Sequence, residues 1–169
     1  MKLFIASDLH GSFFYAKKMI EKFEESNADY LVLLGDILYH GPRNDLPMEY
    51  DCKKVAELLN RYKDKIIAVR GNCDTEVDQM LLEFPILNRN SHILIDGARI
   101  FLTHGHIFNI DNLPNICSGD YLFYGHTHKS LLGNIKGITV LNPGSISLPK
   151  DNMHSYAIME NKKIEIFEL

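Results

Sequence analysis

The chain has 169 residues, of which 46% are hydrophobic and 24% are charged; this balance is typical of one globular domain spanning residues 1–169. A formal net charge of −4 gives no basic field that would attract a long nucleic acid or an anionic membrane surface. No apolar stretch approaches the roughly 20 residues that cross a bilayer, and the three cysteines suggest no disulfide framework. We therefore expect a cytoplasmic protein.

The first half of the chain alternates strand and helix patterns. Each expected helix begins at a capping residue: Ser12, Asp51, and Thr75 of the capping box Thr75–Asp78. Five short apolar runs in the chain, each ended by glycine or polar residues, have the length of buried strands. These runs are residues 3–6, 31–34, 66–69, 100–103 and 121–124.

The second half contains mostly short strands. From about Ser91 onward, turn signals separate them at Asp96-Gly97, at Lys136-Gly137 and at residues 160–163. Few crossover helices remain in this half, so the strands are expected to pair in antiparallel or mixed fashion. The pattern as a whole predicts an α/β fold of two mixed sheets packed together, with helices outside.

All five apolar runs end on residues that can bind a metal ion. Ligands in open α/β sheets gather at the carboxyl ends of strands, so these side chains are expected to converge. They are two carboxylates, one amide and four imidazoles, from Asp8, Asp36, Asn72, His10, His104, His126 and His128. One such motif alone is weak, because Gly-Asp also suits a turn. Five in the same strand context predict a site for two metal ions.

The donor types favour a transition metal. Imidazole, carboxylate and amide donors without a thiolate cluster suit Mn²⁺, with Zn²⁺, Ni²⁺, Co²⁺ and Fe²⁺ as alternatives. Asp8 and His10 stand two residues apart and would share one face of an extended segment. His126 and His128 have the same spacing, but must leave strand geometry if they bind different ions. Since only two of the seven donors are anionic, positive charge remains to attract an anionic substrate.

The order of the motifs resembles the calcineurin-like metallophosphoesterase superfamily. The matching motifs are Asp8-Leu9-His10, Gly35-Asp36, Gly71-Asn72, His104 and Gly125-His126-Thr127-His128. Residues 40–44, 69–74, 102–106 and 142–145 resemble the small bacterial YfcE-type phosphodiesterases more closely. The resemblance implies a four-layer α/β/β/α sandwich of two mixed sheets flanked by helices. It also implies that Asp8, His10, Asp36 and His128 bind one ion, and that Asp36, Asn72, His104 and His126 bind the other.

A site of this kind implies hydrolysis by a metal-bound hydroxide, formed from a water between two ions and attacking phosphorus in line. We assign catalytic positions to Asn72, Cys73 and His104. Candidate substrate contacts are Arg43, His106 and Cys73. A guanidinium can bind phosphate bidentately, although a solvated loop arginine explains Arg43 equally well. Ser145 is interpreted as part of a structural turn and not as a nucleophile.

Cys73 marks a departure from the wider superfamily, in which many members carry a histidine after Gly-Asn. A neutral thiol is a weak hydrogen-bond donor and supplies no positive charge. A phosphomonoester carries nearly two negative charges at neutral pH, whereas a diester carries one. The absence of a positive charge at this position should therefore slow the hydrolysis of a monoester more than that of a diester. The alternative is that Cys73 merely fills space.

These observations favour a metal-dependent phosphodiesterase that acts on small diesters. One alternative is a phosphomonoesterase for small phosphorylated metabolites or nucleotides. Another is a non-catalytic scaffold that keeps the fold, but a scaffold predicts eroded ligands, and every motif position here holds a competent donor. A homo-oligomer is expected on general grounds, with no interface identified.

Overall fold

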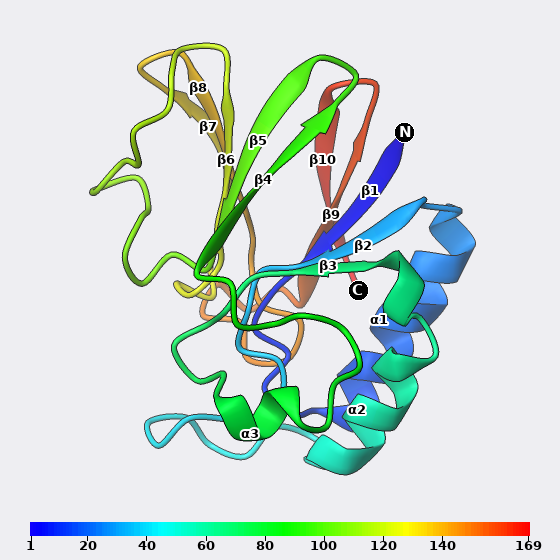
Figure 1. Ribbon diagram of the computed structural model, residues 1–169. Helices are drawn as coiled ribbons and strands as arrows, with labels where there is room; N and C mark the ends of the chain where they lie inside the picture. Colours follow the sequence, from blue (N-terminus) through cyan, green and yellow to red (C-terminus); the bar gives the residue numbers. More distant parts are fainter.

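The computed structural model describes residues 1–169 and contains two five-stranded sheets (Figure 1). The first sheet has the order β10-β9-β1-β2-β3, formed by β1 (Lys2–Ala6), β2 (Tyr30–Leu33), β3 (Ile66–Ala68), β9 (Ser155–Glu160) and β10 (Lys163–Glu168). The second has the order β4-β5-β6-β8-β7, formed by β4 (Asn90–Ile95), β5 (Ala98–Thr103), β6 (Tyr121–Phe123), β7 (Ser130–Ile135) and β8 (Ile138–Pro143). Both sheets mix parallel and antiparallel pairs, which confirms the predicted fold class.

Three helices begin at the predicted capping residues. The side chain of Ser12 accepts a hydrogen bond at the start of α1 (Phe13–Ser26), and Asp51 does so for α2 (Cys52–Asn60). Thr75 and Asp78 form the predicted capping box of the short α3 (Glu76–Gln79). A single 3₁₀ turn, η1 (Lys63–Lys65), joins α2 to β3. None of the helices combines the length and apolar character that a membrane span requires.

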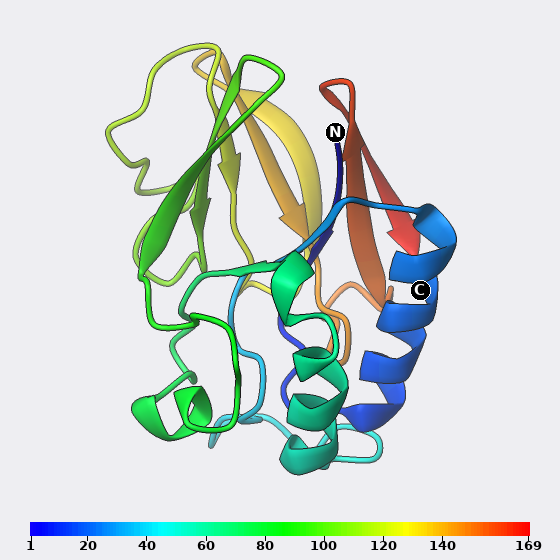
Figure 2. The ribbon, with the colours of Figure 1, turned by 45° about the vertical axis from the view of Figure 1, so that its right-hand side comes forward.

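The core consists of layers on either side of the first sheet. Alternate residues of β1 point to opposite faces, as strand geometry requires. Leu3 and Ile5 pack against the second sheet, whereas Phe4 and Ala6 pack against α1 and α2. Figure 2 shows both helices on the outer side of the first sheet. The first three layers are therefore helix, sheet and sheet.

The fourth layer corrects the prediction that helices flank both sheets. The outer face of the second sheet is covered by residues 105–120, which contain no helix or strand. Apolar side chains of this segment, Phe108, Ile110, Leu113 and Ile116, pack on a cluster around Phe101 and Leu122. Residues 105–120 include Pro114 and several Gly and Asn residues, which favour turns over a helix.

The parallel pairing of the strands determines where the candidate site lies. β1 pairs in parallel with β2, and β2 with β3. β5 pairs in parallel with β6 in the second sheet. The carboxyl ends of these strands therefore meet at one edge of the sandwich, from which the five motif segments emerge.

Candidate metal centre

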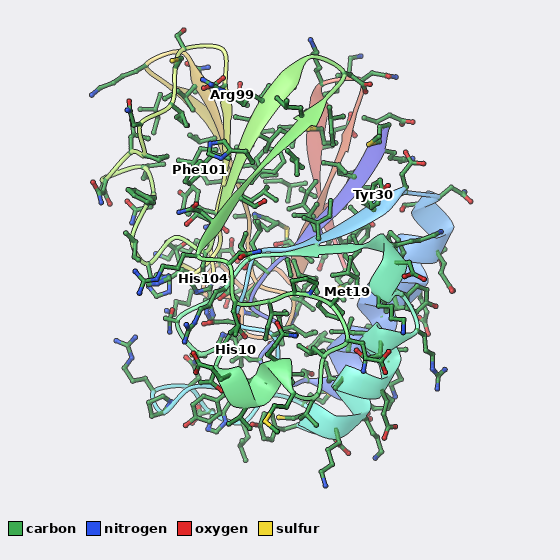
Figure 3. All side chains as sticks on the ribbon, viewed as in Figure 1. His10, Met19, Tyr30, Arg99, Phe101 and His104 are labelled. Carbon is green, nitrogen blue, oxygen red and sulfur yellow. The ribbon has the colours of Figure 1, made fainter.

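The segments after β1 and β2 remain paired beyond the ends of the strands. The backbone N–H of Asp8 donates to Gly35 O over 3.1 Å, and that of His10 donates to Asp36 O over 2.9 Å. From the second sheet, the N–H of His126 donates to Asp8 Oδ2 over 2.9 Å. Figure 3 shows His10 and His104 at this end of the sandwich, with Arg99 at the opposite end of β5. The predicted convergence is confirmed.

Two glycines permit the close approach of these segments. A Cβ on Gly71 would lie 2.9 Å from Asp36 Cγ and still closer to the carboxylate oxygen and backbone nitrogen of that residue. A Cβ on Gly125 would lie 2.8 Å from Asp8 Oδ2. Both carboxylates therefore lie against backbone that has no room for a side chain.

One cluster of candidate ligands contains Asp8, His10 and His128, and all three residues are buried. His128 Nε2 lies 3.2 Å from Asp8 Oδ1, and His10 Nε2 lies 3.7 Å from the same oxygen. Asp8 Oδ1 is buried without a hydrogen-bond partner. An unpartnered buried carboxylate oxygen is costly unless a cation binds it.

A second cluster contains Asp36, His104 and His126. His104 Nε2 lies 3.3 Å from Asp36 Oδ2 and 3.0 Å from Asn72 Oδ1. His10 Nε2 lies 3.7 Å from Asp36 Oδ2 on the other side. Asp36 therefore stands between the two clusters, where a bridging carboxylate is expected.

The outer nitrogens of three histidines are held by backbone carbonyls. Nδ1 donates to Tyr39 O in His10, to Leu34 O in His104 and to Leu148 O in His128, over 2.7–2.8 Å. A carbonyl can only accept, so Nδ1 carries a proton in each ring, and Nε2 is the nitrogen left to face inward and to bind a metal ion once it has lost any proton of its own. The Nε2 atoms of His10 and His128 lie 3.3 Å apart, so a proton on one of them or a metal ion bound by both is needed to offset the repulsion between two lone pairs.

Charge at the site also favours a cation. Burial raises the pKa of Asp8, but the adjacent imidazoles of His10 and His128 outweigh it and hold the pKa well below the ordinary value. Burial lowers the pKa of His104, yet the hydrogen bond with Asp36 and the charges of Asp8 and Asp36 raise it to about 9. Both carboxylates thus favour a positive partner, whether a proton on an imidazole or a metal ion.

The backbone at the ligand positions differs from one sequence expectation. Asp8 and His10 have φ values of 56° and 49°, so they do not share a face of an extended segment as predicted. β1 has already ended at Ala6, and both side chains reach inward from left-handed turns. His126 and His128, with φ values of 67° and 57°, leave strand geometry as predicted.

One positioning residue, Asp74, was missed by sequence reasoning. Buried Asp74 accepts three backbone N–H bonds, from Asp36, Ile37 and Gly71, over 2.7–2.9 Å. It therefore ties the segment after β2 to the segment after β3. The only feature of the sequence that could have indicated this role is that Asp74 is the acidic residue at the end of the Gly71–Asp74 motif. Ser145 Oγ donates to Asp8 O over 2.8 Å, in keeping with the structural role predicted for this residue.

A polar hollow of about 460 Å³ opens over the two clusters. Arg43 and Cys73 line it, together with Asn72 and with Lys150, which sequence reasoning did not select. Burial, followed by the charge of Asp36, raises the pKa of the Cys73 thiol to about 12, so the thiol is neutral at pH 7. His106 does not line this hollow; its ring centre lies 5.4 Å from that of His104, on the side of an adjoining hollow.

Known proteins resemble the chain over its whole length. The family model for the calcineurin-like phosphoesterase superfamily domain matches residues 1–163. The chain is 49% identical to phosphodiesterase YfcE of Escherichia coli K12, over all of this chain and 92% of that protein. A solved structure of E. coli YfcE has a TM-score of 0.97 at 48% identity and covers 99% of this chain and 93% of that one. Phosphodiesterase MJ0936 of Methanocaldococcus jannaschii is 28% identical over all of this chain and 98% of that protein.

Proposed function

The chain belongs to the calcineurin-like phosphoesterase superfamily, and from this premise we propose that it hydrolyses small phosphodiesters with two divalent metal ions. Membership makes it a metal-dependent phosphoesterase. The proposal adds the substrate class, the number of ions and the residues that bind them. Two relatives that match the full chain are named phosphodiesterases, which supports diesters as the substrate.

The observation that carries the proposal is the inward set of nitrogen and oxygen donors that a cation can bind. The Nε2 atoms of His10 and His128 lie 3.3 Å apart beside the unpartnered Asp8 Oδ1. His104 Nε2 faces the Asn72 carbonyl oxygen in the second cluster. These donors fit two cations, one bound by Asp8, His10, Asp36 and His128 and the other by Asp36, Asn72, His104 and His126. The mixed nitrogen and oxygen donors favour Mn²⁺ over Mg²⁺.

When bound, such ions lower the pKa of a coordinated water, which can then attack phosphorus, and offset the charge on the phosphate oxygens. The protein holds its imidazoles in one tautomer through the three carbonyl contacts. It supplies only two carboxylates, so the loaded site stays positive towards an anion. The substrate enters over Asn72, where Arg43 and Lys150 line the hollow and can bind non-bridging oxygens.

Neutral Cys73 supports a diester over a monoester. The Cys73 N–H donates to Asp36 Oδ1 over 2.8 Å, which fixes this residue beside the bridging carboxylate. As a thiol or as a thiolate, this side chain brings no positive charge to match the second charge of a monoester. The volume of the hollow, about 460 Å³, suits a small ester.

A substrate comparison tests the proposal. The protein is stripped with a chelator, reloaded with Mn²⁺ or Mg²⁺, and assayed on bis(p-nitrophenyl) phosphate and on p-nitrophenyl phosphate. We expect no turnover after stripping, recovery with Mn²⁺ at least equal to that with Mg²⁺, and a higher kcat/KM for the diester. Bound metal per chain, measured by elemental analysis, should approach two. Full activity in metal-free protein, or a preference for the monoester, would overturn the proposal.

A further inference from the structure

A second hollow adjoins the candidate metal centre. It has a volume of about 290 Å³ and is lined by Arg70, Gly71, Asn72, Arg89, His106 and Ile107. Asn72 lines both hollows, and its side-chain oxygen lies 3.0 Å from His104 Nε2. The second hollow therefore begins directly beside the candidate ligands, within reach of a group attached to the reacting phosphate.

Two arginines give this hollow a positive charge. The backbone N–H of Arg70 donates to Asn88 O over 2.8 Å, which brings Arg89 alongside the segment after β3. Arg70 Nε donates to Asp74 O over 3.0 Å, so its guanidinium is held in place. No carboxylate lines the hollow.

The chain offers these two arginines only one carboxylate partner, at the surface. Arg89 forms no ion pair. Arg70 lies 3.6 Å from Glu76, but the side chain of Glu76 is 75% exposed, and such surface pairs contribute little. Two guanidiniums at one hollow repel each other, and an anion bound between them would relieve that repulsion. In a chain of net charge −4, this local excess of positive charge indicates an anionic ligand.

We propose that Arg70, Arg89 and His106 form a subsite for a second phosphate group of the substrate, on the far side of Asn72 from Arg43. The guanidiniums bind the phosphate oxygens through charge-assisted hydrogen bonds, and the imidazole adds a further hydrogen-bonding group. The physiological substrate is then a small diester that carries another phosphate. This inference rests on the proposed function.

The test compares two substrates that share the same reacting atoms. Both are p-nitrophenyl esters of thymidine 5′-phosphate, one with a free 3′-hydroxyl and one with a 3′-phosphate. In the Mn²⁺-loaded native protein, kcat/KM should be about tenfold higher for the 3′-phosphorylated ester, mainly through a lower KM. Arg89→Gln should bring the ratio of the two kcat/KM values close to one, and Arg89→Lys should keep part of the preference. Arg61→Gln removes a positive charge at the end of α2, outside both hollows, and should leave the ratio unchanged.

Four outcomes would overturn the inference. Equal kcat/KM for the two esters in the native protein would refute the subsite and leave the proposed function standing. A ratio unaffected by Arg89→Gln, or lowered equally by Arg61→Gln, would show that the preference does not come from this hollow. Failure of the metal-loaded native protein to hydrolyse either ester would overturn the proposed function and this inference with it.

Discussion

Gly71→Ala should disable the candidate site through a single methyl group. The backbone of Gly71 has no positive φ, so alanine meets no conformational strain there. The new Cβ would nevertheless lie 2.9 Å from Asp36 Cγ and overlap the neighbouring carboxylate oxygen. Ordinary contact begins at 3.4 Å, so the Asp36 carboxylate must retreat by roughly 1 Å, and a displacement of that size can cost about 100-fold in rate. Overpacking of this kind typically costs about 1–3 kcal/mol in stability.

The assay measures kcat/KM for bis(p-nitrophenyl) phosphate at saturating Mn²⁺, bound metal per chain, and the free energy of unfolding in urea. We expect kcat/KM to fall by about 100-fold and bound metal to fall with it. Gly133→Ala is the matched control, because its Cβ would meet only Val140 Cγ2, at 3.8 Å, far from the site. This control should keep native activity. Native kcat/KM in Gly71→Ala would refute the inference that the position of Asp36 controls the site.

Three further substitutions probe the site and the fold. Asp36→Asn should lower kcat/KM by at least about 100-fold and reduce bound metal at both positions, since one carboxylate serves both ions; native turnover would show that another residue is the bridge. Cys73→His should shift the ratio of kcat/KM for diester over monoester by about tenfold towards the monoester, and an unchanged ratio at matched metal loading would contradict the role given to Cys73. Hydrogen bonds from Arg99 hold the pKa of Asp120 below its ordinary value, so the ionised carboxylate stabilises the fold at neutral pH and this contribution is lost as the pH falls through the folded-state pKa. Asp120→Asn should therefore lower the free energy of unfolding at pH 7 by less than about 1 kcal/mol, discounted because Arg99 is 45% exposed, and the difference should shrink as the pH falls through the folded-state pKa; a difference that stays constant as the carboxylate is protonated would rule out the ionic origin.

The elements and the donors could be predicted from sequence because each depends on local chemistry. Ser12 and Asp51 precede apolar residues at helical spacing, and capping is a short-range effect. The donors of the candidate centre directly follow their apolar strands, so the parallel topology was enough to bring them together. Residues 105–120 fill the position of an expected helix, because an apolar face can be covered without regular structure.

The remaining features depend on contacts between distant segments. Asp74 bonds the backbone of Asp36 and Ile37, which lie 38 and 37 positions away in the chain. Arg89 reaches the second hollow only because Asn88 pairs with Arg70. Lys150 follows His128 by 22 positions, and its backbone N–H donates to His128 O over 2.8 Å. No local pattern marks these residues, so only the folded chain identifies them.

The left-handed backbone at the candidate ligands bears on how the empty protein behaves. Asp8, His10, Asp36, His126 and His128 all have φ between 49° and 67°, a conformation that costs a non-glycine residue about 1 kcal/mol or more. The fold maintains this strain through backbone pairing between the segments after β1 and β2. Binding energy from an ion is then not consumed in ordering loops, unlike in domains that fold only around their metal. Under the proposed function, the chain thus keeps a less stable fold in return for a preformed metal site, from which ions can leave and to which they can return without refolding.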